Sequence, residues 1–186
     1  MSYKETLCAR KQMNHSQKLL KSIYTACIVT IIFLYGMVCP NWIEAKIVEF
    51  QNVKVNRIID GDTAQFNIPV SGNQTIRIWG IDCPEKKQRF GSQATEFLAS
   101  LIWDKPLKLK IRSKDQYGRL VAQVYHEDID IGLVMVRYGY AWHASTLNKD
   151  KALTKAQSEA KKQGLGLWQD KNPIAPWVFR KTPKAQ

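Results

Sequence analysis

Residues 59–85 read IDGDTAQFNIPVSGNQTIRIWGIDCPE, with acidic residues gathered at both ends. The first end carries Asp60-Gly61-Asp62, between two runs that are rich in strand-forming residues. Glycine tolerates a positive φ, so Gly61 predicts a tight turn that places two carboxylates on a bend instead of alternating them across a sheet. The flanking runs, residues 53–59 and 64–68, are therefore expected to form a β-hairpin.

The second end carries Asp82 and Glu85 just after an alternating run, residues 76–79, that contains Arg77. A glycine and a proline interrupt the chain there, so these acids are also expected at a strand end. If the two strand ends meet, three or four carboxylates converge, and their repulsion requires a cation or a shifted protonation.

The simplest cation is a hard divalent ion, Ca²⁺ or Mg²⁺. The candidate ligands are oxygens, and residues 59–85 contain neither a histidine nor a paired-cysteine motif. The other interpretation is an Asx turn at Asp60-Gly61-Asp62 and a turn or helix-capping acid at Asp82.

Alternation and turn residues predict five short strands in the chain as a whole. These strands span residues 53–59, 64–68, 74–80, 107–111 and 120–125. Helical spacing of apolar residues predicts three helices, at residues 91–102, 131–138 and 149–163. Asp130 is expected to cap the second helix and Gly164 to end the third. This order indicates an α+β fold, a five-stranded OB-type β-barrel with three α-helices, closed by a C-terminal segment rich in tryptophan and proline.

An apolar run, residues 23–39, follows two lysines near the N-terminus. A basic flank before such a run is typical of an export signal over residues 1–45. A cut before Lys46 would leave one folded domain, residues 46–180, and a short basic tail, residues 181–186. The run also approaches the length that spans a bilayer, so an uncleaved signal anchor in the membrane is the alternative. Either interpretation places the domain outside the cytoplasm, as a secreted, periplasmic or membrane-anchored protein.

The chain has a formal charge of +12, of which the part before Lys46 contributes +3. Most of the basic surplus therefore belongs to the predicted domain. A basic surface attracts polyanions through counterion release and steering, so nucleic acid is a candidate partner, although many soluble basic proteins bind none. Only Cys83 follows Lys46, so the mature domain is expected to hold no internal disulfide.

Five motifs, in order over about residues 53–168, resemble those of the staphylococcal nuclease (thermonuclease) family. They are Ile59-Asp60-Gly61-Asp62-Thr63, Arg77-Ile78-Trp79-Gly80-Ile81-Asp82-Cys83-Pro84-Glu85, Asp115-Gln116-Tyr117-Gly118-Arg119, Arg137-Tyr138-Gly139-Tyr140-Ala141 and Gly164-Leu165-Gly166-Leu167-Trp168. Each motif is weak alone, but the combination is specific. The resemblance implies an endonuclease on an OB-type barrel that acts on DNA, RNA or both, and we expect a monomer.

The resemblance also implies a Ca²⁺ site. Asp62 and Asp82 would bind the ion directly, together with the backbone carbonyl of Cys83. Asp60 would support these ligands without touching the metal.

Three further residues have catalytic roles by the same resemblance. Glu85 would accept a proton from the attacking water, while Arg77 and Arg119 would hold the phosphate and its developing charge. The bond between phosphorus and the 5′-oxygen would break, leaving 3′-phosphates. These roles agree with the chemistry, since hydrolysis of a phosphodiester needs a nucleophile, charge compensation and alignment.

Two departures from the family pattern bear on these roles. Cys83 stands where the family often has threonine, a change that a carbonyl ligand tolerates. The nucleotide-stacking tyrosines of the family correspond to Ser145, Thr146 and Leu147 if no gap is placed, so base contacts are left unassigned. Two other function classes remain open, namely a catalytically inactive nucleic-acid-binding module and a membrane-anchored interaction domain. An inactive module normally lacks one of the site residues, and all of them are present here.

Overall fold

A computed structural model describes residues 48–69, 71–146 and 148–182 of the chain. The predicted export signal or anchor, residues 1–45, lies outside the described residues, as does the tail beyond Thr182. None of the helices in the described ranges is long and apolar enough to cross a membrane.

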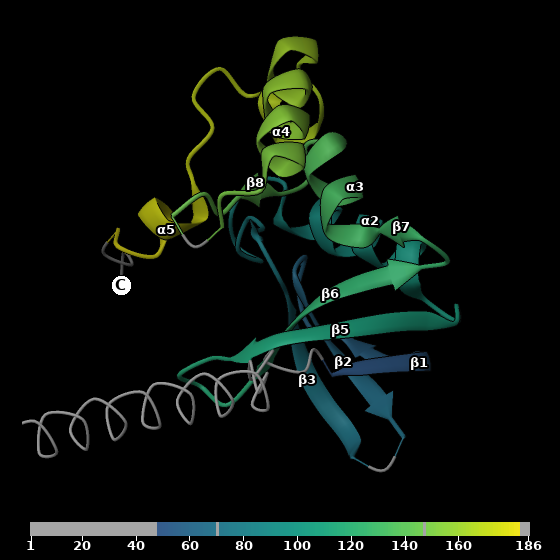
Figure 1. Ribbon diagram of the computed structural model, residues 1–186. Coiled ribbons are helices and arrows are strands. Elements are labelled where there is room, and N and C mark those ends of the chain that lie inside the picture. The colour runs from purple at the N-terminus through teal and green to yellow at the C-terminus, as the bar shows by residue number, and fades with distance from the viewer. Residues whose placement is uncertain (1–47, 70, 147, 183–186) are drawn as a thin grey trace, which may run out of the picture. The chain divides into compact units, whose positions relative to one another are not determined.

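Five strands close into a barrel, as the sequence predicts (Figure 1). They are β1 (Glu49–Ile58), β2 (Thr63–Ile68), β3 (Gly72–Ile78), β5 (Leu107–Lys114) and β6 (Leu120–His126). Neighbouring strands pair antiparallel in the order β3-β2-β1-β5-β6, and the parallel pairing of β3 with β6 closes the ring. The fold is therefore α+β with a five-stranded mixed barrel, and the β1–β2 pairing confirms the predicted hairpin.

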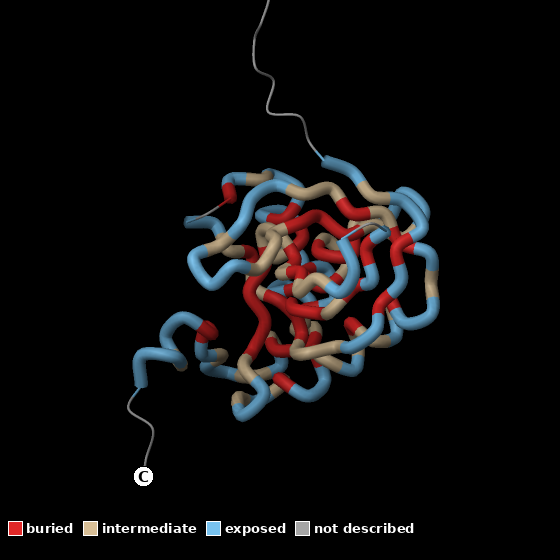
Figure 2. Tube along the Cα trace, turned by 90° about the horizontal axis from the view of Figure 1, so that it is seen from below, coloured by how far each residue is buried: buried red, intermediate tan, exposed pale blue. Residues whose placement is uncertain are grey.

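The two-residue period of the strands explains the core of the barrel. Phe66 and Ile68 of β2, and Ile76 and Ile78 of β3, are at most 1% exposed. Figure 2 shows such buried residues inside the domain with exposed residues around them. Because successive strand residues point to opposite faces, Arg77 lies on the outer face of the barrel wall between two buried isoleucines.

The three predicted helices are confirmed, with small shifts of their ends. They are α2 (Gly91–Ile102), α3 (Ile131–Arg137) and α4 (Lys151–Gln163), and Figure 1 shows them gathered on one side of the barrel. Asp130 caps α3 as predicted, since its carboxylate accepts a hydrogen bond from the Leu133 N–H at 3.1 Å. Gly164 ends α4 in the left-handed conformation, with φ 63°.

The structure also contains short elements that the sequence pattern does not predict. They are β4 (Ile81–Asp82), β7 (Ile129–Asp130), β8 (Trp142–His143), the 3₁₀ helix η1 (Gly166–Gln169) and α5 (Pro176–Phe179). Elements of two to four residues are too short to show a hydrophobic period. The β4–β8 pair places Asp82 opposite Trp142, so it joins the second acidic group to the helical side of the domain.

Candidate active site

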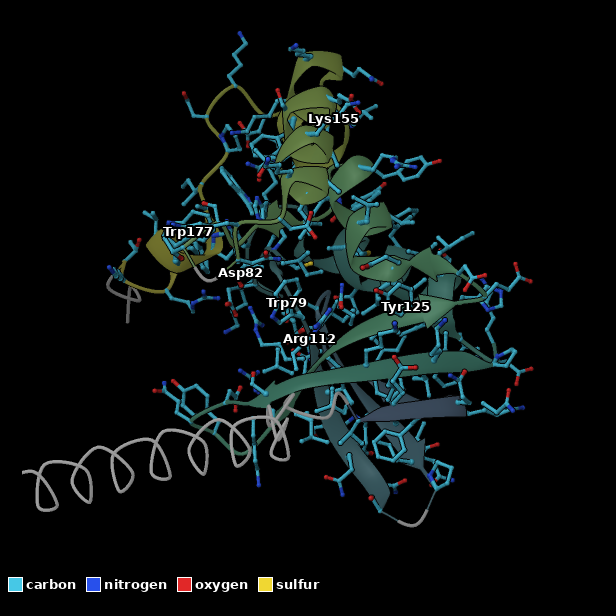
Figure 3. The ribbon with its side chains drawn as sticks, in the orientation of Figure 1. Trp79, Asp82, Arg112, Tyr125, Lys155 and Trp177 are labelled. Carbon is cyan, nitrogen blue, oxygen red and sulfur yellow. The ribbon has the colours of Figure 1, made fainter. Side chains whose placement is uncertain are left out.

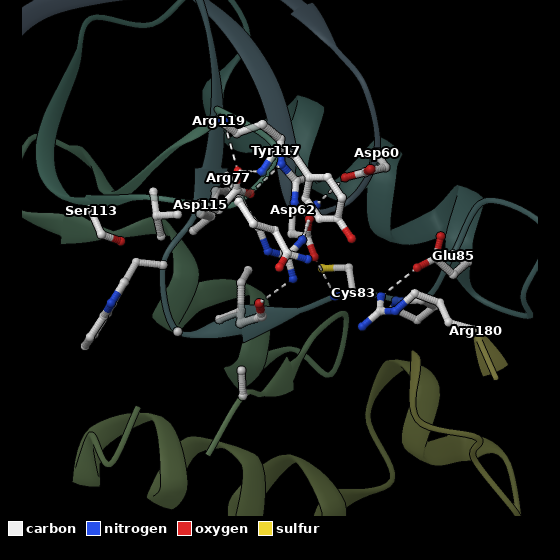
Figure 4. Close-up of a pocket in the computed structure, with 18 residues that line it drawn as sticks. Asp60, Asp62, Arg77, Cys83, Glu85, Ser113, Asp115, Tyr117, Arg119 and Arg180 are labelled. Atoms are coloured by element: carbon white, nitrogen blue, oxygen red, sulfur yellow. Dashed lines mark hydrogen bonds and ion pairs between the residues drawn. The ribbon is translucent and has the colours of Figure 1, made fainter. Parts of the chain in front are cut away.

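A cleft of about 790 Å³ lies beside the end of β3 (Figure 4). Six of the predicted site residues line this cleft, namely Asp60, Asp62, Arg77, Cys83, Glu85 and Arg119. Asp82 lies behind the wall of the cleft, covered by Arg77 and by Arg180, both of which line it. The fold therefore brings together all the segments that the sequence assigns to one site.

The turn between β1 and β2 orients Asp62. The Thr63 carbonyl accepts hydrogen bonds from the N–H groups of Ile59 and Asp60, at 2.9 and 3.1 Å. Asp60 Oδ1 accepts a hydrogen bond from the Asp62 N–H at 3.0 Å. In this Asx-type turn, the Asp60 side chain holds the backbone N–H of Asp62. Asp60 therefore supports Asp62 from behind, as the resemblance implies for a residue that does not itself touch the metal.

The expectation that Gly61 adopts a positive φ is wrong, since its φ is not positive. Glycine is needed at this position for close packing instead. A Cβ atom at residue 61 would lie 2.8 Å from the Cβ of Cys83 and 3.0 Å from that of Ala94. Glycine therefore lets the acidic turn lie against Cys83. The Cys83 thiol donates to the Gly61 carbonyl at 3.1 Å. Burial raises the pKa of this thiol well above its ordinary value, which favours the protonated, unreactive form of Cys83.

Arg77 joins the two acidic ends through its guanidinium. Nη1 donates to Asp62 Oδ1 at 2.5 Å, and Nη2 donates to Asp82 Oδ1 at 2.9 Å and to the Ile81 carbonyl at 3.3 Å. Only 3% of Asp62 and 5% of Asp82 is exposed, so each carboxylate needs a positive partner. The β2–β3 register, which sets Thr63 opposite Arg77, produces this contact. The two strand ends therefore meet, which fulfils the condition set for the convergence of their acids.

The Asp62 carboxylate is held from several sides. Thr63 Oγ1 donates to Oδ1 at 2.8 Å, and the Cys83 N–H donates to Oδ2 at 3.0 Å. Burial raises the pKa of Asp62 above its ordinary value, against the lowering effect of the Arg77 guanidinium. A cation beside this carboxylate favours its ionised form at neutral pH.

No three histidine, cysteine, aspartate or glutamate side chains form a metal-binding cluster within the described part of the chain. The expected convergence of three or four carboxylates is therefore not found among those residues. Guanidinium groups separate the acids instead, because Arg77 lies between Asp62 and Asp82, and Arg180 lies between Asp82 and Glu85. The donor set still fits a hard divalent cation, since it offers carboxylate oxygens from two buried aspartates.

Glu85 lies on the loop between β4 and α2, with 41% of its side chain exposed. Its N–H donates to Gln88 Oε1 at 3.1 Å. Its carbonyl lies against the start of α2, where a Cβ atom on Gly91 would come within 2.0 Å of the Glu85 oxygen. Glycine at residue 91 therefore fixes how closely this loop approaches the helix, and with it the position of a carboxylate that can accept a proton from water.

If Glu85 has the catalytic role that the resemblance implies, replacing Gly91 by alanine is expected to lower turnover at least about tenfold, because a misplacement of about 1 Å in a catalytic group can cost as much as about 10²-fold. The Glu85 loop would have to move to relieve the clash with the new Cβ. Initial rates of the catalysed reaction measure the effect, and Ser92→Ala, at the exposed neighbouring position, is the control. Equal rates for the two variants would contradict this role of Gly91.

The Arg119 guanidinium is held by a hydrogen bond at Nε, while its two Nη atoms have no acceptor among the described residues. Asp115 Oδ2 accepts a hydrogen bond from Arg119 Nε at 2.7 Å, and Asp115 Oδ1 accepts from the Arg119 N–H at 2.9 Å. The guanidinium lies 5.5 Å from the ring centroid of Tyr117. None of the described residues accepts a hydrogen bond from its Nη1 or Nη2. A guanidinium positioned at Nε with its fork directed away from that partner can bind two phosphate oxygens.

Sequence reasoning misses Arg180, which follows α5. Its Nη2 donates to Asp82 Oδ2 at 2.6 Å, and its Nη1 donates to Glu85 Oε1 at 2.7 Å and to Asp82 Oδ1 at 3.2 Å. Figure 3 shows Asp82 in the region where α5, which carries Trp177, approaches the barrel. Arg180 is 98 positions from Asp82 and belongs to a tail with other basic residues, so no local pattern identifies it.

The aromatic residues near the unassigned stacking positions pack within the domain. Trp142 lies edge-on to Trp168, with ring centroids 4.4 Å apart, and to Trp177 at 5.5 Å. His143 is 3% exposed. The C-terminal tryptophans thus clamp the domain, as predicted.

Comparison with known proteins identifies a family for this constellation. The model of the family described as "Staphylococcal nuclease homologue" matches residues 75–170. An uncharacterized endonuclease of Escherichia coli O157:H7 is 35% identical over 154 residues, which cover 82% of this chain and 94% of the relative.

Two other relatives are similar at comparable levels. An uncharacterized endonuclease of Haemophilus influenzae is 38% identical over 138 residues, covering 73% of this chain and 76% of the relative. A micrococcal nuclease of Shigella flexneri is 35% identical over 144 residues, covering 70% of this chain and 81% of the relative.

Proposed function

The chain belongs to the staphylococcal nuclease family and is an endonuclease that hydrolyses phosphodiester bonds, and from this premise we propose that it is an exported, Ca²⁺-dependent nuclease of DNA, RNA or both. Cleavage breaks the bond between phosphorus and the 5′-oxygen and leaves 3′-phosphates. The observation that carries the proposal is the contact of one guanidinium, Arg77, with two buried aspartates at the edge of a cleft that also holds Glu85 and Arg119.

Asp62 and Asp82 are the proposed Ca²⁺ ligands, with the backbone carbonyl of Cys83, and Asp60 orients Asp62. Oxygen donors of this kind suit Ca²⁺, which accepts flexible coordination, better than Mg²⁺, which demands near-ideal octahedral geometry. When bound, Ca²⁺ would supply positive charge to the phosphoryl oxygens.

The side chains around the cleft carry the proposed hydrolysis. Glu85 accepts a proton from water as the water oxygen bonds to phosphorus, and the 5′-oxygen leaves and takes up a proton from solvent. Arg119 binds phosphate oxygens through its fork. Arg77 has five N–H groups, and those not engaged by Asp62, Asp82 and the Ile81 carbonyl are available for the phosphate. Both arginines oppose the negative charge that develops in the transition state.

The strand order and the parallel β3–β6 closure support an OB-type barrel, whose curved sheet is a common nucleic-acid platform. The formal charge of +12 supports a polyanionic substrate.

Incubation of the purified protein with single-stranded DNA, double-stranded DNA and RNA tests this function. Each substrate is treated with Ca²⁺, with Mg²⁺ or with a chelator, and product ends are identified by mass spectrometry. We expect Ca²⁺-dependent internal cleavage with 3′-phosphate ends. Full activity in chelator, or equal activity with Mg²⁺, would contradict the proposed cofactor.

The proposed export rests on residues 1–45, and a reporter fusion tests it. A reporter that follows these residues is expected to cross the membrane, and the released protein is expected to begin near Lys46. Fractionation and N-terminal sequencing measure both outcomes, with a reporter that lacks residues 1–45 as control. An exported but uncut fusion would support the anchor interpretation, and a cytoplasmic full-length fusion would reject export.

A further inference from the structure

The C-terminal segment, residues 173–182, folds back onto the active site through Arg180. This guanidinium makes a two-pronged contact with Asp82 and a further contact with Glu85, at 2.6–3.2 Å. These two acids are the proposed metal ligand and the proposed general base. One basic side chain from the end of the domain thus forms an ion pair with both.

The fold holds Arg180 in this place. Ala175 and Pro176 are buried at the start of α5, and the Arg180 N–H donates to the Pro176 carbonyl at 2.9 Å. Trp177 of α5 packs edge-on to Trp142, with ring centroids 5.5 Å apart. Trp142 is the residue that pairs with Asp82 between β8 and β4. The segment that carries Arg180 is therefore anchored next to the strand pair that carries its partner.

Arg180 covers oxygens that a metal ligand must expose. Asp82 Oδ2 accepts from Arg180, and Asp82 Oδ1 accepts from both Arg180 and Arg77. Asp82 does not line the cleft, whereas Arg180 and Arg77 do. A cation that approaches Asp82 from the cleft therefore meets a guanidinium first.

The two arginines differ in how firmly they are held. Arg77 lies within β3, with 22% of its side chain exposed, and also contacts Asp62. Arg180 follows a one-turn helix at the end of the domain, with 46% of its side chain exposed. A guanidinium does not lose its proton in proteins, so Arg180 can release its partners only by movement of its side chain or of the segment that carries it. Water can solvate the half-exposed Arg180 more readily than Arg77 when the contact breaks.

We propose that Arg180 is a tethered cation that competes with the divalent metal ion for Asp82 and pairs with Glu85, so that residues 173–182 form an autoinhibitory segment. This inference rests on the proposed function of Asp82 and Glu85. The segment lifts Arg180 away before Asp82 binds metal and Glu85 accepts a proton. The apparent association constant for the metal then equals the intrinsic constant multiplied by the fraction of molecules in which Arg180 is displaced.

Titration of the purified full-length chain with Ca²⁺ in a calorimeter tests this inference. We expect Arg180→Ala to bind Ca²⁺ about tenfold more tightly than the wild type, as for a contact that is closed in about nine molecules of ten. The rise in Tm on addition of Ca²⁺ should also be larger in the variant, since tighter binding to the folded state stabilises it more. Turnover at saturating Ca²⁺ should not fall.

Lys181→Ala is the matched control, because Lys181 is exposed, carries the same charge and makes no ion pair with the other described residues. Its Ca²⁺ affinity should equal that of the wild type. Arg180→Gln keeps a long polar side chain without the charge and should bind Ca²⁺ as tightly as Arg180→Ala. Agreement between the two variants would show that the gain does not come from a folding defect in one of them.

Three results would overturn the inference, and each is distinct. Unchanged Ca²⁺ affinity with slower cleavage in Arg180→Ala would make Arg180 a phosphate-binding residue. Equal gains in Ca²⁺ affinity in Arg180→Ala and Lys181→Ala would show that the effect comes from the net charge of the protein and not from the contact of Arg180 with Asp82. Absence of Ca²⁺ binding in every protein, wild type included, would remove the proposed metal site itself, and the competition with it.

Discussion

Replacement of Asp82 by alanine is expected to lower nuclease activity about 10³-fold or more and to remove the response to Ca²⁺. Charge compensation by a bound divalent ion contributes several kcal/mol in the transition state, and about 1.4 kcal/mol corresponds to a factor of ten. Asp82 is buried and is one of two aspartates that meet across Arg77. Calorimetric titration with Ca²⁺ and initial cleavage rates measure the two effects.

The Asp82→Ala protein should remain folded. Breaking a buried ion pair lowers the free energy of unfolding by about 3–5 kcal/mol when it leaves an unpaired charge. In Asp82→Ala, however, Arg77 would still form an ion pair with Asp62, and Arg180 with Glu85. We therefore expect a smaller loss, of no more than about 2 kcal/mol, in thermal unfolding with chelator present. Asp128→Ala removes a fully exposed carboxylate and is the control. Unchanged Ca²⁺ binding in Asp82→Ala would exclude this residue as a ligand.

Replacement of Arg77 by lysine is expected to lower turnover roughly 10²-fold or more, with a much smaller change in substrate affinity. Lysine keeps the charge but has one nitrogen where arginine has a planar fork. That fork reaches Asp62 with Nη1 and Asp82 with Nη2, so a single ammonium cannot hold both aspartates and also bind a phosphate oxygen in the same geometry. Separate determination of kcat and KM measures the split. Arg119→Lys should show the same pattern, because its Nε contact with Asp115 would be lost.

Surface lysines give the comparison for these arginines. Lys108 and Lys110 lie on β5 and pair with exposed or partly exposed acids, Asp128 and Glu49. Replacing either lysine by alanine should mainly weaken binding and reduce its salt dependence. If Arg77→Lys behaved like those lysine variants, with turnover intact, its catalytic role would be wrong.

Local sequence signals account for most of the fold. The two-residue alternation of β2, β3 and β5 and the helical spacing of α2 and α4 record which face of each element is buried, and burial of one face is what the fold requires of them. Caps are local as well, since the Asp130 carboxylate reaches an N–H group three residues away. The two-residue strands β4 and β8 escape prediction because their pairing depends on segments about 60 residues apart, with Ile81 opposite His143.

The candidate site divides in the same way. The acidic turn at Asp60-Gly61-Asp62 and the arginine of β3 are visible because strands and turns have local signatures. The reason for Gly61 is not visible, because the atom that excludes a side chain belongs to Cys83 on another segment. Likewise, the acids were expected to converge on one point, whereas the packed chain places guanidinium groups between them.

By itself, the sequence determined the barrel and the helices, because these depend on residue type and short-range spacing. The roles proposed for the site residues come from the resemblance of their motifs to those of the family. Only the tertiary structure decided that Asp82 lies behind the cleft wall and that Arg180 reaches it from the far end of the domain. Such contacts depend on closure of the barrel and on the packing of α5 against Trp142, which bring distant residues together without leaving any period or motif in the chain.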